Sequence, residues 1–156
     1  MSFLDRINQC KAPDLSAYLP FIVGGEVVGY VKPDFAAALK DYPDTFVCGD
    51  ESVALNEHLS GPDNRTAAVG EVLEALMQRG DLPGWRGEKY KVPTSFSAPT
   101  LFDIERAAVA PFGIIGYGVH LNGVVLTDDG LTMWIARRSL SKPTGPGKLD
   151  QIVAGG

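Results

Sequence analysis

The stretch LTMWIARRSLSKPTGPGKLDQIVAGG, residues 131–156, decides how the second half of this chain is interpreted. Its apolar and β-branched residues up to Arg137 predict a strand, and the glycines and prolines of 138–147 predict a loop. A second strand is expected over 148–154. Upstream, a strand is expected near 114–126, with Asp128-Asp129-Gly130 as the turn between 114–126 and 131–137 and Asn122-Gly123 as the alternative turn. The last 43 residues therefore look like the first strands of a separate unit.

The residues before this region predict a mixture of helices and strands. Residues 21–31 (FIVGGEVVGYV) indicate two short strands around Gly24-Gly25, which tolerates the positive φ of a tight hairpin. Helices are expected over 2–10, over 35–41 with Asp34 as the cap, over 101–109, and most clearly over 66–79. In the last of these, apolar residues recur at helical spacing and Gly80 follows the helix end. Residues 60–65 and 82–100 are expected to be irregular. The sequence thus predicts a first domain over 1–113.

Composition and charge exclude several classes of protein. The chain has 156 residues and a net charge of −5, which argues against a nucleic-acid polymer as the partner. No apolar run is long enough to cross a membrane, and the first residues lack the apolar core of a secretion signal. We therefore expect a cytoplasmic protein with no membrane partner. The cysteines, Cys10 and Cys48, are too few for a disulfide framework and have no metal-binding CxxC spacing.

The positive charge of the second region is confined to one loop. Its four cations, Arg137, Arg138, Lys142 and Lys148, fall within residues 137–148, which contain no acidic residue. Such a loop on an acidic protein suits a small polyanion better than a polymer. Arginine binds phosphate oxygens in bidentate fashion, and glycine backbone permits close approach. We therefore regard Arg137, Arg138 and Lys142 as candidate contacts to substrate phosphates, with a solvated basic loop as the alternative.

Other chemical signatures are weaker. The sequence has neither a phosphate-binding Walker loop nor a G-x-S-x-G nucleophile elbow, and neither His58 nor His120 has a partner at zinc-ligand spacing. We expect His120 to be a core or edge residue whose hydrogen bonds are satisfied. The segment WRGE, residues 85–88, together with LFDIERAA, 101–108, is expected to use Arg–Glu pairs that tie a loop to a helix.

Taken together, these stretches resemble a known family. The run 131–156 resembles the entry into a Nudix hydrolase domain, in which a strand ending in Arg, a loop and a Pro-Gly strand lead to a Gly-Gly pair. That pair's second glycine, Gly156 here, begins the Nudix box G-x5-E-x7-R-E-U-x-E-E-x-G-U. WRGEKY, IERAAVAPFG and YGVHLNG are similar to the N-terminal domain of thiamine-pyrophosphokinase-related Nudix proteins. The chain departs from that pattern at Pro111 and Val124.

The resemblance implies an α+β protein, with a mixed α/β accessory domain over 1–113 and the first strands of a truncated Nudix α/β/α sandwich over 114–156. It implies a parent enzyme that cleaves a diphosphate linkage in a nucleoside- or thiamine-diphosphate-like small molecule, using Mg2+ or Mn2+. The glutamates of the box are absent from these 156 residues. Of the metal site, only the backbone of Gly155 and Gly156 is expected here, with no catalytic residue and no bound metal. We therefore expect the isolated chain to be inactive.

Two alternatives remain open at this point. One is a noncatalytic module that binds a ligand or another protein. The other concerns assembly, because a sheet that is cut off partway leaves unpaired strand edges, and these could pair two copies into a homo-oligomer.

Overall fold

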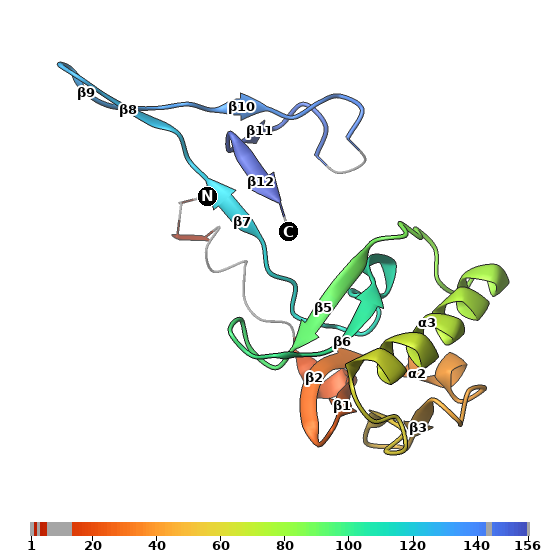
Figure 1. Ribbon diagram of the computed structural model, residues 1–156. Coiled ribbons are helices and arrows are strands. Elements are labelled where there is room, and N and C mark those ends of the chain that lie inside the picture. The colour runs from red at the N-terminus through yellow and green to blue at the C-terminus, as the bar shows by residue number, and fades with distance from the viewer. Residues whose placement is uncertain (1, 3, 6–13, 143–144, 156) are drawn as a thin grey trace. The chain divides into compact units, whose positions relative to one another are not determined.

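The computed structural model describes residues 2, 4–5, 14–142 and 145–155, and its contacts divide the chain into two compact units, 1–115 and 116–156 (Figure 1). The described residues contain both helices and strands, so the predicted α+β class is confirmed. Most of the helix predicted over 2–10, together with Cys10 and Gly156, lies outside the described residues. Among the described residues, no helix combines the length and apolar character needed to cross a bilayer.

Unit 1 begins with the hairpin that the sequence predicts. A short 3-10 helix, η1 (Leu15–Ala17), precedes β1 (Leu19–Val23) and β2 (Glu26–Val31), which pair antiparallel. Gly24 and Gly25 form the turn with φ values of +62° and +86°, a conformation that glycine adopts without steric penalty. Two three-residue strands that the sequence analysis missed, β3 (Phe46–Cys48) and β4 (Val53–Leu55), complete a sheet in the order β2-β1-β4-β3. β4 runs parallel to β1.

Both main helices of unit 1 begin earlier than predicted. α2 spans Pro33–Leu39 rather than 35–41, and the expected cap is wrong, because Lys32 occupies the cap position and Asp34 lies in the first turn. α3 spans Pro62–Arg79 rather than 66–79. In each case a proline stands in the first turn, where its fixed φ and missing N–H are compatible with a helix. The predicted C-terminus of α3 is confirmed, since Gly80 is left-handed at φ +83°.

The predicted helix over 101–109 is wrong. Thr100–Glu105 forms strand β6, which pairs antiparallel with β5 (Lys89–Pro93), and only Arg106–Ala108 turns into a short 3-10 helix, η2. The segment 82–100 is therefore not wholly irregular. Phe102 and Ile104, two residues apart, are both buried, which is the alternation of a strand. Pairing with β5 decides the conformation, and β5 lies outside the segment whose periodicity suggested a helix.

Aromatic rings fill the centre of unit 1. Phe21, Phe46, Phe102 and Phe112 are at most 2% exposed, and the ring centroid of Phe112 lies 4.9 Å from that of Phe21 and 5.7 Å from that of Phe46. Beside Phe112, the backbones of two glycines meet. A Cβ on Gly113 would overlap the carbonyl oxygen of Tyr30, and a Cβ on Gly29 would overlap that of Phe112. Residues 112–113 therefore lie directly against β2.

Unit 2 consists of paired strands within its described residues. The Asp128-Asp129 turn of the hairpin between β8 and β9 is confirmed. The three longer strands predicted here each divide into two, because neighbouring halves pair with different partners: β7 with β12, β8 with β9, and β10 with β11. The strands are β7 (Val119–Leu121), β8 (Val124–Thr127), β9 (Gly130–Met133), β10 (Ala136–Arg137), β11 (Leu149–Asp150) and β12 (Val153–Gly155). None of the described residues of unit 2 is buried.

Candidate functional site

The cationic loop, defined as residues 137–148, leaves β10 and returns to β11. Backbone hydrogen bonds close its base: the N–H of Arg138 donates to the carbonyl of Lys148 at 2.9 Å, and the N–H of Gly147 donates to the carbonyl of Arg138 at 3.2 Å. Gly145 and Gly147 both adopt left-handed φ values, +57° and +69°, which let the chain turn back here. The loop is therefore anchored at its two ends by the β10–β11 pair.

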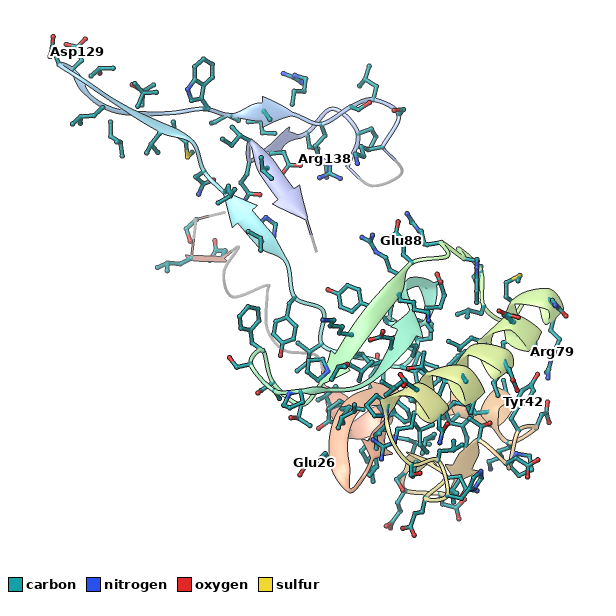
Figure 2. The ribbon with its side chains drawn as sticks, in the orientation of Figure 1. Glu26, Tyr42, Arg79, Glu88, Asp129 and Arg138 are labelled. Atoms are coloured by element: carbon teal, nitrogen blue, oxygen red, sulfur yellow. The ribbon has the colours of Figure 1, made fainter. Side chains whose placement is uncertain are left out.

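Arg137 and Arg138 are held by different partners. The Nη1 of Arg137 donates to the carbonyl of Gly147 at 3.0 Å, and the Arg137 residue is exposed. The Nη1 of Arg138 lies 2.6 Å from Oδ2 of Asp150, and both side chains of this ion pair are about three-quarters buried, at 28% and 25% exposed. The guanidinium of Arg138, followed by the backbone N–H of Gln151, lowers the pKa of Asp150. The charge of Arg138, which is labelled in Figure 2, is therefore balanced within the protein by Asp150.

The third predicted phosphate contact, Lys142, is an exposed residue whose backbone N–H donates to the carbonyl of Ser139 at 3.2 Å. The structure places a different lysine near Arg138. A Cβ on Gly145 would lie 3.4 Å from Cδ of Lys148 and 3.7 Å from Nε of Arg138. Arg138 and Lys148 thus both flank Gly145, and Lys148, although part of the cationic stretch, was not among the three candidates.

The predicted backbone metal contacts fall at the end of β12. Gly155 pairs with Val119 of β7, and Gly156 lies outside the described residues. Within the described part of the chain, no three His, Cys, Asp or Glu side chains are grouped so that they would hold a metal ion. Gly155 contributes no carboxylate, and the carboxylate of Asp150 is engaged by Arg138 and Gln151. The described residues therefore do not fit the Mg2+ or Mn2+ site of a Nudix enzyme.

A shallow cavity of about 300 Å3 lies beside the ion pair of unit 2. Asp150 and Gln151 form its polar side, and Trp134, which is 66% exposed, belongs to its apolar side. His120 lies nearby in the hydrogen-bond network, with Nδ1 2.7 Å from Oε1 of Gln151. His120 is therefore an exposed strand histidine with a hydrogen-bond partner, which confirms the expectation of a satisfied edge residue.

The WRGE segment of unit 1 is tied to a strand rather than to the expected helix. The backbone N–H of Arg86 donates to Oε1 of Glu105 at 2.8 Å, and the N–H of Arg106 donates to the carbonyl of Glu88 at 2.8 Å. The predicted Arg–Glu pairing is present as an ion pair between Arg106 and Glu88, which raises the pKa of Arg106.

A second cavity, of about 600 Å3, lies within unit 1 between this segment, α3 and β6. Sequence reasoning did not find it, because its residues come from three separate parts of the chain. One signal was available: Asp63, Gly70, Glu71 and Glu74 recur along one face of α3 as a polar, small-residue stripe opposite the apolar one.

Comparison with known proteins identifies relatives of both units. The model of the domain of unknown function DUF4743 matches residues 2–116. Two proteins of Arabidopsis thaliana align with 99% of the chain: the protein named Nudix hydrolase 20, chloroplastic, at 43% identity, and the protein named Nudix hydrolase 24, chloroplastic, at 42% identity. The resemblance to Nudix hydrolases is thus confirmed. The chain spans 44% and 43% of the length of these two relatives.

Proposed function

The chain belongs to the DUF4743 family, and from this membership and its likeness to proteins named Nudix hydrolases we propose that it is part of an enzyme that hydrolyses a diphosphate linkage. The observation that carries the proposal is the alignment of 99% of the chain, unit 2 included, with two proteins of that name. We propose as the substrate a small nucleoside- or thiamine-diphosphate-like molecule.

Within this proposal, the cationic loop contacts the substrate phosphates. Arg137 is the best placed, because its guanidinium has five N–H donors and the hydrogen bond to Gly147 uses one of them. Lys142 adds an exposed positive charge. Arg138 is less suited to direct contact, since its charge is paired with Asp150; its ion pair instead holds β11 against the end of β10.

A divalent metal, Mg2+ or Mn2+, is proposed for the complete enzyme, where it would neutralise phosphate charge and orient the attacking water. The described residues of this chain do not form such a site, and the sequence has no REUxEE segment. The same observation supports the proposal that the isolated 156-residue chain does not hydrolyse diphosphates.

The activity proposal is tested in the complete enzyme. Arg137→Ala is expected to lower kcat/KM for a diphosphate substrate by roughly tenfold or more, because a charge-assisted hydrogen bond to phosphate is lost. Arg137→Lys keeps the charge without the bidentate fork, so its kcat/KM should lie between those of the unmodified enzyme and of Arg137→Ala. Lys40→Ala removes an exposed cation from unit 1 and serves as the control.

Unchanged kinetics for Arg137→Ala would remove Arg137 from the substrate site. In parallel, the isolated chain is assayed with Mg2+ or Mn2+ against nucleoside diphosphates and thiamine diphosphate. No hydrolysis is expected, and turnover that depends on the added metal would contradict the proposed inactivity.

Two further proposals concern assembly and location. The strand ribbons of unit 2 present edges that other strands can pair with, and we propose that these edges support self-association of the chain. A monomeric mass by light scattering at high concentration would contradict this. Cytoplasmic location is a proposal from the sequence, and the names of the two plant relatives carry the word chloroplastic.

A further inference from the structure

A third cavity, of about 300 Å3, lies in unit 1 where strands β1 and β4 end. These two strands run parallel, with Ile22 paired to Ala54, so their carboxyl ends meet at the same edge of the sheet. Beyond that edge, β1 continues into the Gly24-Gly25 turn and β4 into the loop 56–61 that leads to α3. The crevice outside the carboxyl ends of parallel strands is the common ligand position in open α/β sheets. We define the glycine-turn cavity as the space lined by Gly24, Gly25, Leu55, Asn56, Leu59 and Arg65.

One wall of the glycine-turn cavity is the guanidinium group of Arg65. Its Nε donates to the carbonyl oxygen of Leu59 at 3.0 Å. A Cβ on Gly24 would lie 3.4 Å from Nη2 and 4.0 Å from Nη1 of the same group. Because Leu59 and Gly24 both line the cavity, these distances place the guanidinium between the loop and the glycine turn. Its two terminal nitrogens lie on the side of the turn.

The loop that holds Arg65 is itself fixed by hydrogen bonds. The N–H of Asn56 donates to the carbonyl of Thr45 at 2.9 Å, and the side-chain Nδ2 of Asn56 donates to the carbonyl of Pro43 at 3.3 Å. The N–H of Leu59 then donates to the carbonyl of Asn56 at 3.0 Å. The guanidinium of Arg65 is thus anchored to a carbonyl whose own position is set, so the cost of ordering it is met before a ligand binds.

The positive charge of Arg65 has no counterion among the described residues, whose ion pairs involve Arg79, Arg106 and Arg138. Arg65 is partly buried, and the hydrogen bond to Leu59 uses one of the five N–H donors of its guanidinium. The four N–H groups of Nη1 and Nη2 have no acceptor within the part of the chain that the structure describes. Because burial removes part of the hydration of this cation, an anion that accepts from these donors would be favoured.

The remaining lining indicates which anion fits. Ile22, Ala54, Leu55 and Leu59 supply aliphatic surface, which suits a ligand with a hydrocarbon body. Arg65 is the one cation of this lining, and the exposed acid Glu57 also belongs to it. A singly charged head group is therefore favoured over a phosphate dianion. A planar carboxylate matches the parallel donors of a guanidinium, and a volume of about 300 Å3 suits a small molecule.

We propose that the glycine-turn cavity of unit 1 binds a small aliphatic carboxylate. Nη1 and Nη2 of Arg65 donate to its two oxygens, and Ile22, Leu55 and Leu59 contact its hydrocarbon chain. The absence of side chains on the Gly24-Gly25 turn leaves the terminal nitrogens of Arg65 open to the ligand. This site belongs to unit 1, whereas the cationic loop that is proposed to contact phosphates belongs to unit 2.

The test is an NMR titration of the full chain, labelled with 15N, with 4-methylpentanoate. The amide signals of Gly24 and Gly25 report binding at the cavity, and those of Gly145 and Gly147 report binding at the cationic loop. 4-Methylpentanamide is the matched neutral ligand, and 3-methylbutyl phosphate is the matched dianion. The carboxylate is expected to shift the signals of Gly24 and Gly25 and to bind at least about tenfold more tightly than the amide. It should also bind more tightly than the phosphate.

Substitutions on α3 separate binding from folding. The readout is the ratio of the affinities for the carboxylate and for the amide, because a general loss of structure lowers both. Arg65→Gln removes the charge and should reduce this ratio to about one, whereas Arg65→Lys keeps the charge without the fork and should retain part of it. Arg79→Gln is the matched control, since it removes an arginine at the other end of the same helix. Arg79 is paired with Asp41 and Asp81, so the ratio should stay unchanged.

Four results would overturn the proposal. Equal affinity of the unmodified chain for the carboxylate and the amide would show that the cavity does not recognise the charge, and this comparison requires no variant. Tighter binding of the phosphate would make the cavity a phosphate site. Shifts at Gly145 and Gly147 in place of Gly24 and Gly25 would assign the carboxylate to the cationic loop. An unchanged ratio in Arg65→Gln would exclude Arg65 as the group that binds it. None of these readouts involves diphosphate hydrolysis, so the proposed enzymatic function stands or falls separately.

Discussion

The two units of this chain use similar strand-forming residues with opposite results. In unit 1, alternate strand residues such as Phe102 and Ile104 are at most 1% exposed, because α3 packs against β6 and the ring of Phe102 meets that of Phe21 in β1. In unit 2, the equivalent apolar residues are open to solvent: Leu126 is 80% exposed and Leu131 is 71% exposed. A sequence pattern therefore predicts which residues form strands, but what covers those strands depends on other segments.

This difference in burial also means that the two units differ in what stabilises them. Unit 1 has a closed aromatic core, whereas the described strands of unit 2 pair as two-stranded ribbons, which are marginal in water without a covering layer. Exposed apolar surface of this extent is typical of a face that another surface covers. We expect substitutions to affect the two units very differently.

The largest difference is expected from removing one large side chain in each unit. Phe112→Ala should lower the free energy of unfolding of unit 1 by about 3–5 kcal/mol, because a fully buried ring leaves a cavity. Trp134 lies in unit 2 and is 66% exposed, so Trp134→Ala should change the free energy of unfolding of the chain by no more than about 0.5 kcal/mol. Urea unfolding measures both. A comparable loss for Trp134→Ala would show that unit 2 has a core of its own.

A smaller effect is expected from adding one methyl group at a glycine. Gly113→Ala should cost about 2–4 kcal/mol, because alanine is strained at φ +58° and its Cβ overlaps the backbone of Tyr30. Gly130→Ala in unit 2 also has positive φ, +121°, but its Cβ would meet nothing within 4 Å. The difference between the two variants in thermal unfolding isolates the effect of the close backbone approach. Equal losses would mean that φ strain alone accounts for both.

The smallest effect concerns the ion pair between Arg138 and Asp150 at the base of the cationic loop. The Arg138 hydrogen bond lowers the pKa of Asp150, so the pair stabilises the fold above the ordinary pKa of an aspartate, and this contribution disappears as the pH falls through the lowered value. A carboxyl titration by NMR should give a midpoint for Asp150 below that of an ordinary aspartate. Arg138→Gln should raise the midpoint. An unchanged midpoint in this variant would exclude Arg138 as the cause.

Local signals predicted the parts of the fold that local chemistry determines. Gly24-Gly25 predicted the first hairpin because positive φ is needed there, and the apolar spacing of residues 69–77 predicted α3 because one face of that helix is buried. The helix expected over 101–109 was wrong because its conformation depends on pairing with 89–93. Prolines in that neighbourhood also concealed β5. The missed starts of α2 and α3 were readable, since Pro33 and Pro62 are ordinary first-turn residues.

The functional residues were predictable only where they are neighbours in the sequence. Arg137, Arg138 and Lys142 stand out as a charged run, but the run does not reveal that Asp150 pairs with Arg138 or that Lys148 and Arg138 both flank Gly145. The second cavity, which lies in unit 1, was not predictable in the same way. It brings together α3, the residues around Trp85 and the end of β6, and these three segments become neighbours only when the unit is packed.

The contact of Gly113 with β2 determines where unit 1 can be cut without loss of its packing. This contact joins the end of the unit to its first hairpin through the backbones of residues 29–30 and 112–113. A version of the unit that stops before Phe112 would lose both Phe112 and the contact of Gly113 with Tyr30, whereas one that stops after Ile115 would keep both. Residues 14–115 are therefore best transferred as a single piece if unit 1 is to be studied in another protein.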